Sequence, residues 1–558
     1  MIVECVPNFS EGRDLNIIKQ ITDGIEKVDG VRLLNVDPGK ATNRTVVTFV
    51  GHPDAVVQAA YQAIKKAAEL IDMPSHSGEH PRMGATDVCP LVPVSGISLE
   101  KTAKYAHKLG KMVGDDLGIP VYMYEASATQ PLRKNLATIR AGEYEGLEKK
   151  MADSQWKPDY GPDQFNSKSG ATVIGARDFL VAYNVNLNTT STRRANAIAF
   201  DVREQGRIKV DKAGKNIVDE EGNPIRIPGT CKAVKAIGWY IEEYGIAQIS
   251  MNLTDIHVTP LHIAFDEVCK SAEKRGLRVT GSELVGLVPK SVLIDAGKYF
   301  LKKQRRSTGI SEAEIIHIAI KSLGLDELSP FDPKQRIIEY MLEDAASTHP
   351  LIQKTLIGFA EATAAESPAP GGGSISAYVG ALGAALGTMV ANLSAGKKGW
   401  DEKIEYYSEF AEEGQRIKDL LLKSVDEDTM AFNQILEAFK LPKGNETEIK
   451  ARSEAIASAT KGAILVPLNV MKVAHTAFPL LKEMVINGLQ SSASDAGVGA
   501  LCIRTCIEGA FLNVKINCSG FKEAAFVEEV MEQASQISQS AKELESEILD
   551  ILNGIIKR

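Results

Sequence analysis

The stretch from Ser75 to Pro90 gathers titratable side chains in a segment that cannot be helical. It reads Ser-His-Ser-Gly-Glu-His-Pro-Arg-Met-Gly-Ala-Thr-Asp-Val-Cys-Pro, and Pro81 and Gly84 are among the residues that break a helical pattern. Residues 86–94 alternate and branch like a buried strand. A polar loop that leads onto a rigid strand commonly carries catalytic groups, so we expect chemistry here.

Within this stretch, His80 is the candidate general acid or base. An imidazole paired with Asp37 or Asp87 would titrate near neutral pH and could move a proton in either direction. The same residues also fit an ordinary polar turn in which His80 pairs with a nearby carboxylate. A zinc site of His76 and His80 is disfavoured, because ligands four residues apart share a face only on a helix.

Two other polar stretches also follow predicted strands in this half of the chain. They are Asn8–Gly12 and the pair Asp37–Gly39 with Asn43–Thr45. Strand ends of a split βαβ sheet meet at one edge, so we expect these stretches to converge with the His80 loop. An Asp before Pro-Gly is also typical of a simple turn, which is the alternative for Asp37.

A second candidate, Asp428, lies on a predicted helix far along the chain. The apolar stripe of this helix is formed by Val425, Phe432, Ile435 and Phe439. Asp428 falls on the stripe, whereas Asp426 and Glu427 are expected to be surface charges. A buried carboxylate is costly unless it is paired or used, and burial raises its pKa toward that of a useful base. A salt bridge to a neighbouring helix is the alternative.

The segment Ala369-Pro-Gly-Gly-Gly-Ser374 precedes a helix of small residues. It lacks the Lys-Ser/Thr ending of a phosphate-binding Walker loop. Free N–H groups of Gly371, Gly372 and Gly373 could still hold an anion or a carbonyl. A plain N-cap role for Ser374 is slightly favoured on sequence alone.

A long segment without periodicity, residues 156–170, is rich in Gly, Pro and Asx. Such loops are often functional, and a mere connector is the alternative. The last ten residues of this segment are Gly161, Pro162, Asp163, Gln164, Phe165, Asn166, Ser167, Lys168, Ser169 and Gly170.

Composition sets wider limits. The 558 residues carry a net charge of −8, which argues against general nucleic-acid binding. Seven scattered cysteines without a CxxC pair, and a first segment without a secretory pattern, predict a cytoplasmic protein. No cluster with metal-ligand spacing is found, so no metal is expected. The uncharged stretch 367–396 is long enough to span a membrane, but its Gly and Ala content favours a buried core helix.

Hydrophobic periodicity predicts the order βαββαβ twice, which is the ferredoxin-like split motif. In the first unit the predicted strands are 2–6, 31–36, 45–50 and 86–94, and the helices are 14–27 and 54–71, extended by helix 99–116 and strand 121–125. In the second unit the strands are 179–187, 234–241, 247–253 and 277–287, and the helices are 192–205 and 261–275. Residues 208–233 interrupt it as a surface excursion.

Helical spacing covers 311–323 and 333–342 and then continues to the end of the chain. We therefore predict an α+β N-terminal half with two ferredoxin-like subdomains, followed by an all-α helical bundle. Two architectures in one chain suggest two functions.

These motifs together resemble a known enzyme family. Those similar to glutamate formimidoyltransferase are Val3-Glu-Cys-Val-Pro-Asn-Phe-Ser-Glu-Gly12, Gly78-Glu-His-Pro-Arg-Met-Gly84, Asp87-Val-Cys-Pro90 and Arg140-Ala-Gly-Glu-Tyr-Glu145. Those similar to formimidoyltetrahydrofolate cyclodeaminase are Ala369–Ser374 and Val425–Phe432. Because the likeness covers nearly the whole chain, it points to the bifunctional formimidoyltransferase-cyclodeaminase family.

The resemblance implies a folate enzyme of histidine breakdown, whose co-substrate tetrahydrofolate is polyglutamylated and whose other substrate is formiminoglutamate. By similarity His80 is the catalytic histidine of the transferase, 161–170 its folate-binding loop, and Asp428 the cyclodeaminase proton acceptor. Asp37 is expected to orient the transferase site, and Arg82 to hold substrate carboxylates.

Family boundaries put the transferase subdomains at 1–178 and 179–342, a linker at 343–350 and the cyclodeaminase at 351–558. Family members form homo-oligomers built from dimers. Neither a nucleic acid nor a membrane span is expected. A transferase with a structural or folate-binding helical half is the alternative within the enzymes, and a folate-binding scaffold with dead sites is the alternative outside them.

Overall fold

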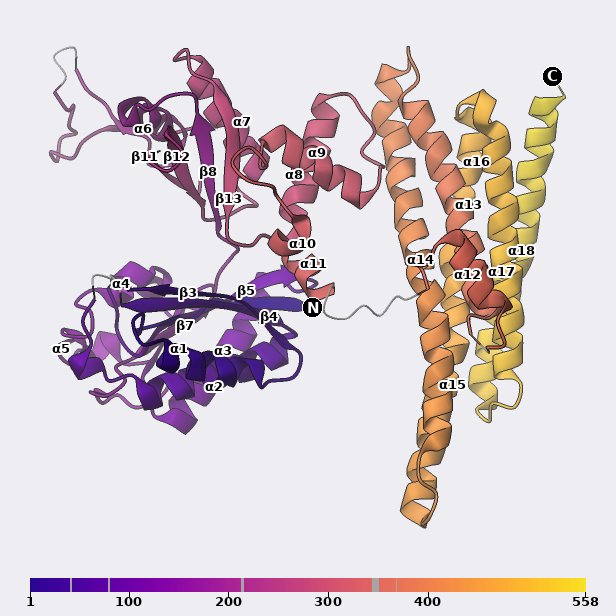
Figure 1. Ribbon diagram of the computed structural model, residues 1–558, viewed down its shortest axis with the longest axis horizontal. Helices are drawn as coiled ribbons and strands as arrows, with labels where there is room; N and C mark the ends of the chain where they lie inside the picture. The colour runs from indigo at the N-terminus through magenta and orange to yellow at the C-terminus, as the bar shows by residue number, and fades with distance from the viewer. Residues whose placement is uncertain (41–42, 79–80, 212–214, 344–350, 368, 558) are drawn as a thin grey trace. The chain divides into compact units, whose positions relative to one another are not determined.

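The computed structural model of the protein describes residues 1–40, 43–78, 81–211, 215–343, 351–367 and 369–557. The chain divides into two compact units, which we treat separately. One comprises Met1–Val292 and Gly324–Leu342, and the other Leu293–Leu323 and Glu343–Arg558. The predicted mixed-sheet N-terminal half and helical C-terminal half are confirmed (Figure 1).

The first unit begins with a seven-stranded mixed sheet. Its strands are β1 (Ile2–Cys5), β2 (Asn8–Phe9), β3 (Val31–Gly39), β4 (Arg44–Gly51), β5 (Thr86–Ser95), β6 (Val121–Glu125) and β7 (Thr172–Ala176). β1 and β2 both lie between β4 and β5, and β3 pairs with β4 on the outer side. β7 pairs in parallel with both β5 and β6. β7 was missed from sequence, because its residues follow a long Gly- and Pro-rich loop.

Three helices cover one face of this sheet, as Figure 1 shows. They are α1 (Leu15–Glu26), α2 (Pro53–Leu70) and α3 (Leu99–Leu117); the short helices α4 (Leu136–Arg140) and α5 (Leu147–Met151) follow β6. Asp14 begins α1 by accepting hydrogen bonds from the N–H groups of Asn16 and Ile17. Odd-numbered residues of β1 and β5, including Val3 and Cys89, are buried with these helices. The even-numbered positions face the other way, where the cleft described below is located.

A second sheet of four antiparallel strands completes this unit. It contains β8 (Val181–Leu187), β11 (Val234–Ile241), β12 (Ile246–Leu253) and β13 (Val279–Val285), in the order β11-β12-β8-β13. Helices α6 (Thr192–Val202) and α7 (Leu261–Glu273) accompany it. The excursion between α6 and β11 contains a small two-stranded ribbon of β9 (Arg207–Ile208) and β10 (Arg226–Ile227).

The helix predicted at 333–342 is two helices, α10 (Pro333–Arg336) and α11 (Ile338–Glu343). Ile337 between them is extended and forms a parallel bridge with Val288. Pairing with another segment, which periodicity cannot reveal, interrupts the helix here.

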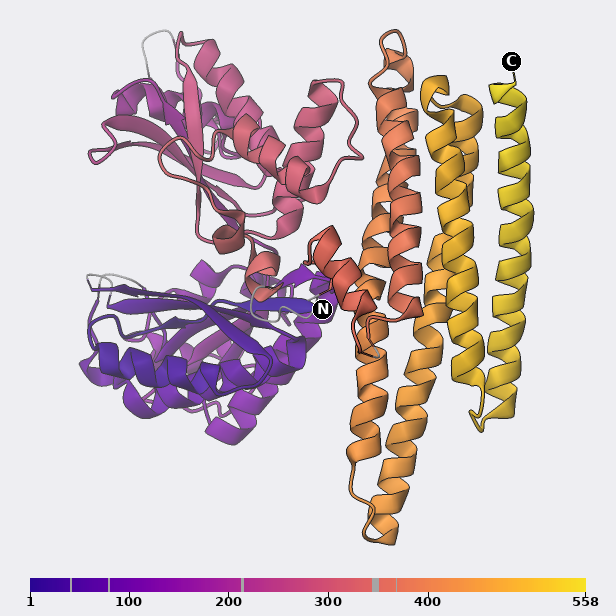
Figure 2. The ribbon, with the colours of Figure 1, turned by 45° about the vertical axis from the view of Figure 1, so that its right-hand side comes forward.

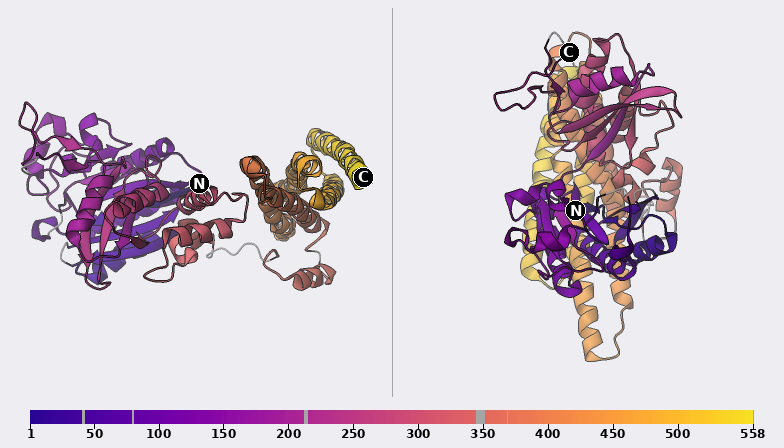
Figure 3. Two further views of the ribbon diagram at one scale, coloured as in Figure 1. Left: turned by 90° about the horizontal axis from the view of Figure 1, so that it is seen from above. Right: turned by 90° about the vertical axis from the view of Figure 1, so that its left-hand side faces the viewer.

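The second unit is helical. Its elements are α8 (Lys290–Lys303, from Leu293 onward), α9 (Glu312–Leu323), α12 (Leu356–Ala364), α13 (Gly372–Ala395), α14 (Ile404–Lys440), α15 (Glu446–His475), α16 (Phe478–Asn487), α17 (Ala493–Cys518) and α18 (Ala524–Ile556). Long helices run side by side in Figure 2, and the left view of Figure 3 looks down them.

Small residues set the spacing at the centre of this bundle. A Cβ at Gly380 would lie 2.5 Å from the Cys506 Sγ atom, and one at Gly383 would lie 2.9 Å from the Gly499 carbonyl oxygen. Side chains would therefore push α13 and α17 apart. Three segments, Gly372–Ala395, Glu446–Asn487 and Gln490–Cys518, are long and apolar enough to cross a membrane by length and composition. Most of the apolar stretch in Gly372–Ala395 is buried within the bundle.

The sequence-based assignment of Asp426 to the surface is wrong. Its side chain is 1% exposed, and its two oxygens accept hydrogen bonds from the N–H groups of Leu351 (2.9 Å) and Ile352 (3.4 Å). The carboxylate therefore anchors the segment that leads into α12. Glu427 instead forms a partly exposed pair with Lys423, one helical turn away.

We predict that Asp426→Ala lowers the free energy of unfolding of the helical unit by about 2–4 kcal/mol, because two N–H donors lose their acceptor. Urea melts followed by circular dichroism would measure this. Glu427→Ala, which removes the pair with Lys423 and a hydrogen bond from the Ser424 hydroxyl (3.2 Å), is the control and should cost about 0–1 kcal/mol. Equal melting of Asp426→Ala and wild type would contradict the anchoring role.

Candidate active sites

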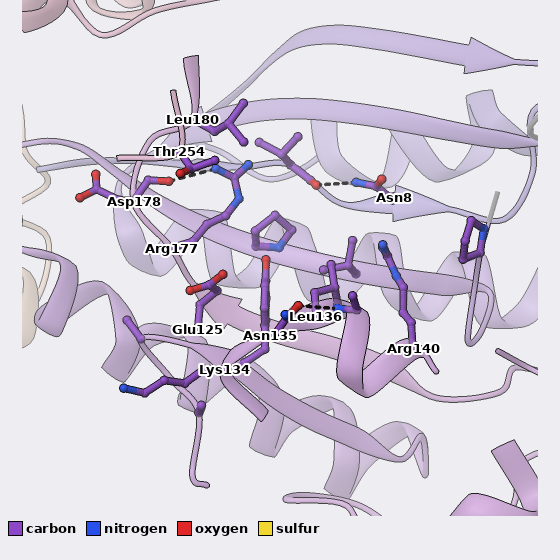
Figure 4. A pocket seen from close by; sticks show the side chains of 18 of the residues that line it. Asn8, Glu125, Lys134, Asn135, Leu136, Arg140, Arg177, Asp178, Leu180 and Thr254 are labelled. Carbon is purple, nitrogen blue, oxygen red and sulfur yellow. Dashed lines mark hydrogen bonds between the residues drawn. The ribbon is translucent and has the colours of Figure 1, made fainter. Parts of the chain in front are cut away.

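A cleft of about 1060 Å³ lies in the mixed-sheet unit, between residues of its two sheets (Figure 4). The first sheet contributes Asn8, Pro90 and Tyr124, and the second sheet and its loops contribute Lys235 and Thr254. Both basic and acidic side chains line the cleft. These are Arg44, Glu125, Lys134, Arg140, Glu143, Arg177, Asp178, Lys235 and Asp255.

The polar stretches that follow the first strands converge at this sheet edge. The Ser10 hydroxyl donates to the Gly84 carbonyl (2.7 Å), and the Gly12 N–H donates to the Asn43 side chain (3.1 Å). Asn43 in turn donates to the Ser77 carbonyl (3.0 Å). Its left-handed backbone, with φ of 46°, suits an Asn in a tight turn.

His80 and its neighbour Glu79 lie outside the described residues. Pro81, which follows them, lines the cleft. The other histidine of the stretch has a structural role. His76 Nε2 contacts the Asn43 carbonyl oxygen (2.9 Å), and its Nδ1 accepts a hydrogen bond from Arg82 Nε (3.2 Å). The proton of neutral His76 is therefore on Nε2.

The structure does not favour Arg82 as a binder of substrate carboxylates. Its guanidinium is 8% exposed and already bonds to Glu145 (2.7 and 2.9 Å) and Glu143 (3.2 Å). A further bond goes to the His76 carbonyl (3.1 Å). Glu143 and Glu145 follow Arg82 by some sixty residues. Together with His76 they satisfy its donors, so Arg82 ties two loops together.

Asp87 is similarly engaged. It is fully buried, pairs with Arg140 and accepts a hydrogen bond from the Met83 N–H (3.0 Å). Asp37 is exposed on β3 and lies near Arg44, a cleft residue. Burial lowers the pKa of Arg44, as does the nearby Arg140, whereas Asp87 and Asp37 oppose this effect. Asp37 therefore acts on the electrostatics of the cleft.

The predicted loop 161–170 packs against the segment that follows His80. The Ala85 N–H donates to the Ser169 carbonyl (2.9 Å), and Lys168 Nζ donates to the Glu69 carbonyl at the end of α2 (2.9 Å). Phe165 lies 5.5 Å from the Tyr144 ring. None of its ten residues is among those that line the 1060 Å³ cleft, so the loop lies outside the lining of this cleft.

In the helical unit, Asp428 meets the first turn of α13. Its carboxylate accepts hydrogen bonds from the hydroxyl (3.2 Å) and the backbone N–H of Ser374. The single proton of this hydroxyl is shared with the Val425 carbonyl (2.8 Å), and the oxygen also contacts the Thr429 hydroxyl (3.2 Å). Ser374 is not the N-cap, because Gly371 holds that position, so the N-cap expectation was wrong.

The glycines give the carboxylate its space. A Cβ at Gly373 would lie 2.1 Å from Asp428 Oδ1, whereas one at Gly372 would be 3.5 Å from the Asn513 Nδ2 atom. Asn513 therefore lies next to the glycine turn. Asn517 donates to the Ala463 carbonyl (2.8 Å) and is structural.

Burial raises the pKa of Asp428, against the opposing effect of the two hydrogen bonds from Ser374. The carboxylate can therefore take up a proton near physiological pH more readily than an exposed Asp. The predicted stripe holds near Val425, which is buried, but Phe439 is 53% exposed. Within the described residues, no three His, Cys, Asp or Glu side chains group as metal ligands would.

Comparison with known proteins gives three sequence-profile matches. They are "Formiminotransferase domain, N-terminal subdomain" at residues 2–177, "Formiminotransferase domain" at 182–343 and "Formiminotransferase-cyclodeaminase" at 355–536. The chain is 44% identical to formimidoyltransferase-cyclodeaminase of Dictyostelium discoideum over 554 residues, which cover 99% of each chain.

Two shorter proteins each match part of the chain. Glutamate formimidoyltransferase of Thermoplasma acidophilum is 43% identical over 303 residues, or 54% of this chain and 92% of that protein. Methenyltetrahydrofolate cyclohydrolase of Methylorubrum extorquens is 32% identical over 201 residues, or 36% of this chain and 97% of that protein.

We predict that Gly373→Ala destabilises the helical unit by about 1–3 kcal/mol, because the new methyl group must displace the Asp428 carboxylate. Gly372→Ala is the matched control, since its methyl group meets Asn513 at an ordinary contact distance. It should melt at or above the wild-type temperature. Thermal melts of the two variants would measure the difference, and an equal loss in both would contradict the close approach.

Proposed function

The chain belongs to the formimidoyltransferase-cyclodeaminase family, and from this premise we propose how its residues divide the two reactions. The observation that carries the function is the similarity along 99% of both chains, which includes both catalytic halves.

The protein is a bifunctional folate enzyme of histidine degradation. It transfers the formimino group of N-formimino-L-glutamate to N5 of tetrahydrofolate and releases L-glutamate. It then cyclises the 5-formimino product to 5,10-methenyltetrahydrofolate and releases ammonia.

For the transfer, we propose that His80 is the general acid. N5 attacks the formimino carbon, and the bond to the glutamate nitrogen breaks once that nitrogen is protonated. Pro81, the next residue in the chain, lines the cleft. Asp37 tunes the charge of Arg44, and loop 161–170 binds the folate. The role of Arg82 is to hold the loops rather than the substrate.

For the cyclisation, we propose that Asp428 moves one proton. N10 attacks the formimino carbon of the same molecule, which needs little beyond positioning. Asp428 takes the proton from N10 and returns it to the departing amine, which leaves as ammonia. Its raised pKa, with the Ser374 hydrogen bonds holding the carboxylate in place, supports this role. The glycine turn 371–373 cradles the pterin or the formimino group.

We propose that each sheet of the first unit belongs to a ferredoxin-like subdomain. The supporting observation is a shared strand order. In the first sheet β1 pairs with β4 on one side and β5 on the other, and in the second sheet β8 lies between β12 and β13. We propose functional boundaries at 1–178, 179–342 and 351–558, with a linker at 343–350. The matches at 2–177, 182–343 and 355–536 support them.

We also propose a cytoplasmic homo-oligomer that uses polyglutamylated tetrahydrofolate. Exposed apolar residues at heptad-like spacing on α13, namely Leu382, Met389 and Leu393, form a surface suited to a second copy. Leu512 and Ile516 extend a similar stripe on α17. The seven cysteines of the chain are free thiols, which suits a reducing compartment.

Incubation with formiminoglutamate and tetrahydrofolate tests the assignment. Wild type should form methenyltetrahydrofolate, seen by its near-ultraviolet absorbance. His80→Ala should slow glutamate release by about 10²–10⁴-fold, and Asp428→Asn should release glutamate normally but accumulate 5-formiminotetrahydrofolate. Glu427→Gln, one residue away, is the control. Glutamate release without methenyl product in wild type would make the helical half structural, and folate binding without turnover would make the protein a binder.

The pH dependence of the second step gives a separate prediction. Because Asp428 must be ionised to act as a base, cyclisation should fail as pH drops through its pKa. Ser374→Ala removes a donor that lowers this pKa, so the acidic limb of kcat should move to higher pH. Thr429→Val is the control, because it removes a hydroxyl that contacts the Ser374 hydroxyl and leaves Ser374 itself in place. A limb that stays in place or moves to lower pH in Ser374→Ala would contradict the assignment.

A further inference from the structure

Glu125 ends β6 on a backbone that glutamate rarely adopts. Its φ is +52°, in the left-handed region that favours glycine. Glu125 is the last residue of β6, and it pairs with Ala176 of the neighbouring strand β7. Residues in such conformations gather at functional sites, where the surrounding structure maintains them. Glu125 lines the cleft, and Figure 4 shows its side chain pointing into it.

A second glutamate of the same cleft provides the contrast. Glu143 has a φ of +53° and also lines the cleft, but its carboxylate bonds to Arg82 (3.2 Å). Glu125 makes no side-chain hydrogen bond or ion pair with any residue in the described part of the chain. Glu143 is thus bonded within the protein, whereas Glu125 is available to a ligand.

Positive charge surrounds Glu125 without contacting it. Partial burial raises its pKa, and the charges of Arg177, Lys235 and Lys134 oppose that rise. All three basic side chains line the cleft. A carboxylate in this field can accept hydrogen bonds from a ligand that carries donors, while the cations suit the carboxylates of that ligand.

We propose that Glu125 is a substrate-binding residue of the transferase site, which accepts two parallel N–H donors from a planar N–C–N group of a co-substrate. This inference rests on the proposed function, because both co-substrates carry such a group. One is the amidinium of formiminoglutamate, and the other is the 2-amino-pyrimidinone edge of the pterin. A carboxylate matches either group with two parallel hydrogen bonds.

Equilibrium binding by calorimetry tests this without turnover. The probes are formiminoglutamate and tetrahydrofolate, each added alone, with L-glutamate and p-aminobenzoyl-L-glutamate as controls that lack the N–C–N group. Glu125→Gln should weaken one of the two co-substrates by about 10- to 100-fold, because the amide offers one acceptor and one opposed donor. Binding of both controls should not weaken.

Two variants separate binding from charge and folding. Asp255→Asn removes a negative charge from the same cleft, but Asp255 is used by the N–H groups of His257 and Val258, so co-substrate affinity should not fall. Glu125→Gly relieves the left-handed backbone, so it should melt at or above the wild-type temperature while losing the same affinity. A structural role would lower the melting temperature instead.

If Glu125→Gln weakens only the binding of formiminoglutamate, the group that Glu125 binds is the amidinium. If it weakens only the binding of tetrahydrofolate, that group is the pterin edge. Either result supports the proposal. No weakening, or equal weakening of a control ligand, overturns it. A wild type that binds both co-substrates but transfers nothing would refute the proposed function and leave the binding test of Glu125 intact.

Discussion

The Asp428 carboxylate occupies the volume in which a side chain at position 373 would lie, and the catalytic end of the helical unit depends on this close approach. It requires a glycine at the start of α13, and it brings the Ser374 hydroxyl and N–H onto the carboxylate. Further along α13, Gly380 and Gly383 let α17 approach equally closely. The composition that suggested a membrane span is thus what close packing around one buried acid requires.

In the mixed-sheet unit, charged groups constrain the loops before they can serve a ligand. Arg82 and Asp87 are both buried and fully engaged, and each joins the segment after His80 to residues 140–145. An ion pair that is already satisfied costs little to keep buried, but it cannot also bind a substrate strongly. Glu125 and Lys235, which line the cleft, form no ion pair with any described residue, and this is why the proposed ligand contact is placed there.

Sequence patterns singled out the His80 stretch and the Asp428 helix but could not give the surroundings of every residue in them. The spacing of Asp428 from Val425 predicted a carboxylate shielded from solvent, because helical periodicity is local, and burial does raise the pKa of Asp428. Asp426 was misassigned because its partners are backbone N–H groups 75 and 74 residues earlier. The ion pairs of Arg82 were not predicted for the same reason, with Glu143 and Glu145 lying 61 and 63 residues later. Glu125 carried no sequence signal, since neither its φ nor its lack of a partner follows from residue type.

Backbone strain adds a clue that neither motif nor burial provides. Four non-glycine residues described in the mixed-sheet unit have positive φ; Asn43, Glu125 and Glu143 lie at or beside the cleft, and Ala233 is not among the residues that line it. Asn43 and Glu143 are fixed by bonds to Ser77 and Arg82, so their conformations follow from the loops they hold. Glu125 has no such bond to any described residue, and a glycine would occupy its position at lower cost. A side chain that is kept where the backbone disfavours it, and where the protein makes no use of it, is best explained by what enters the cleft.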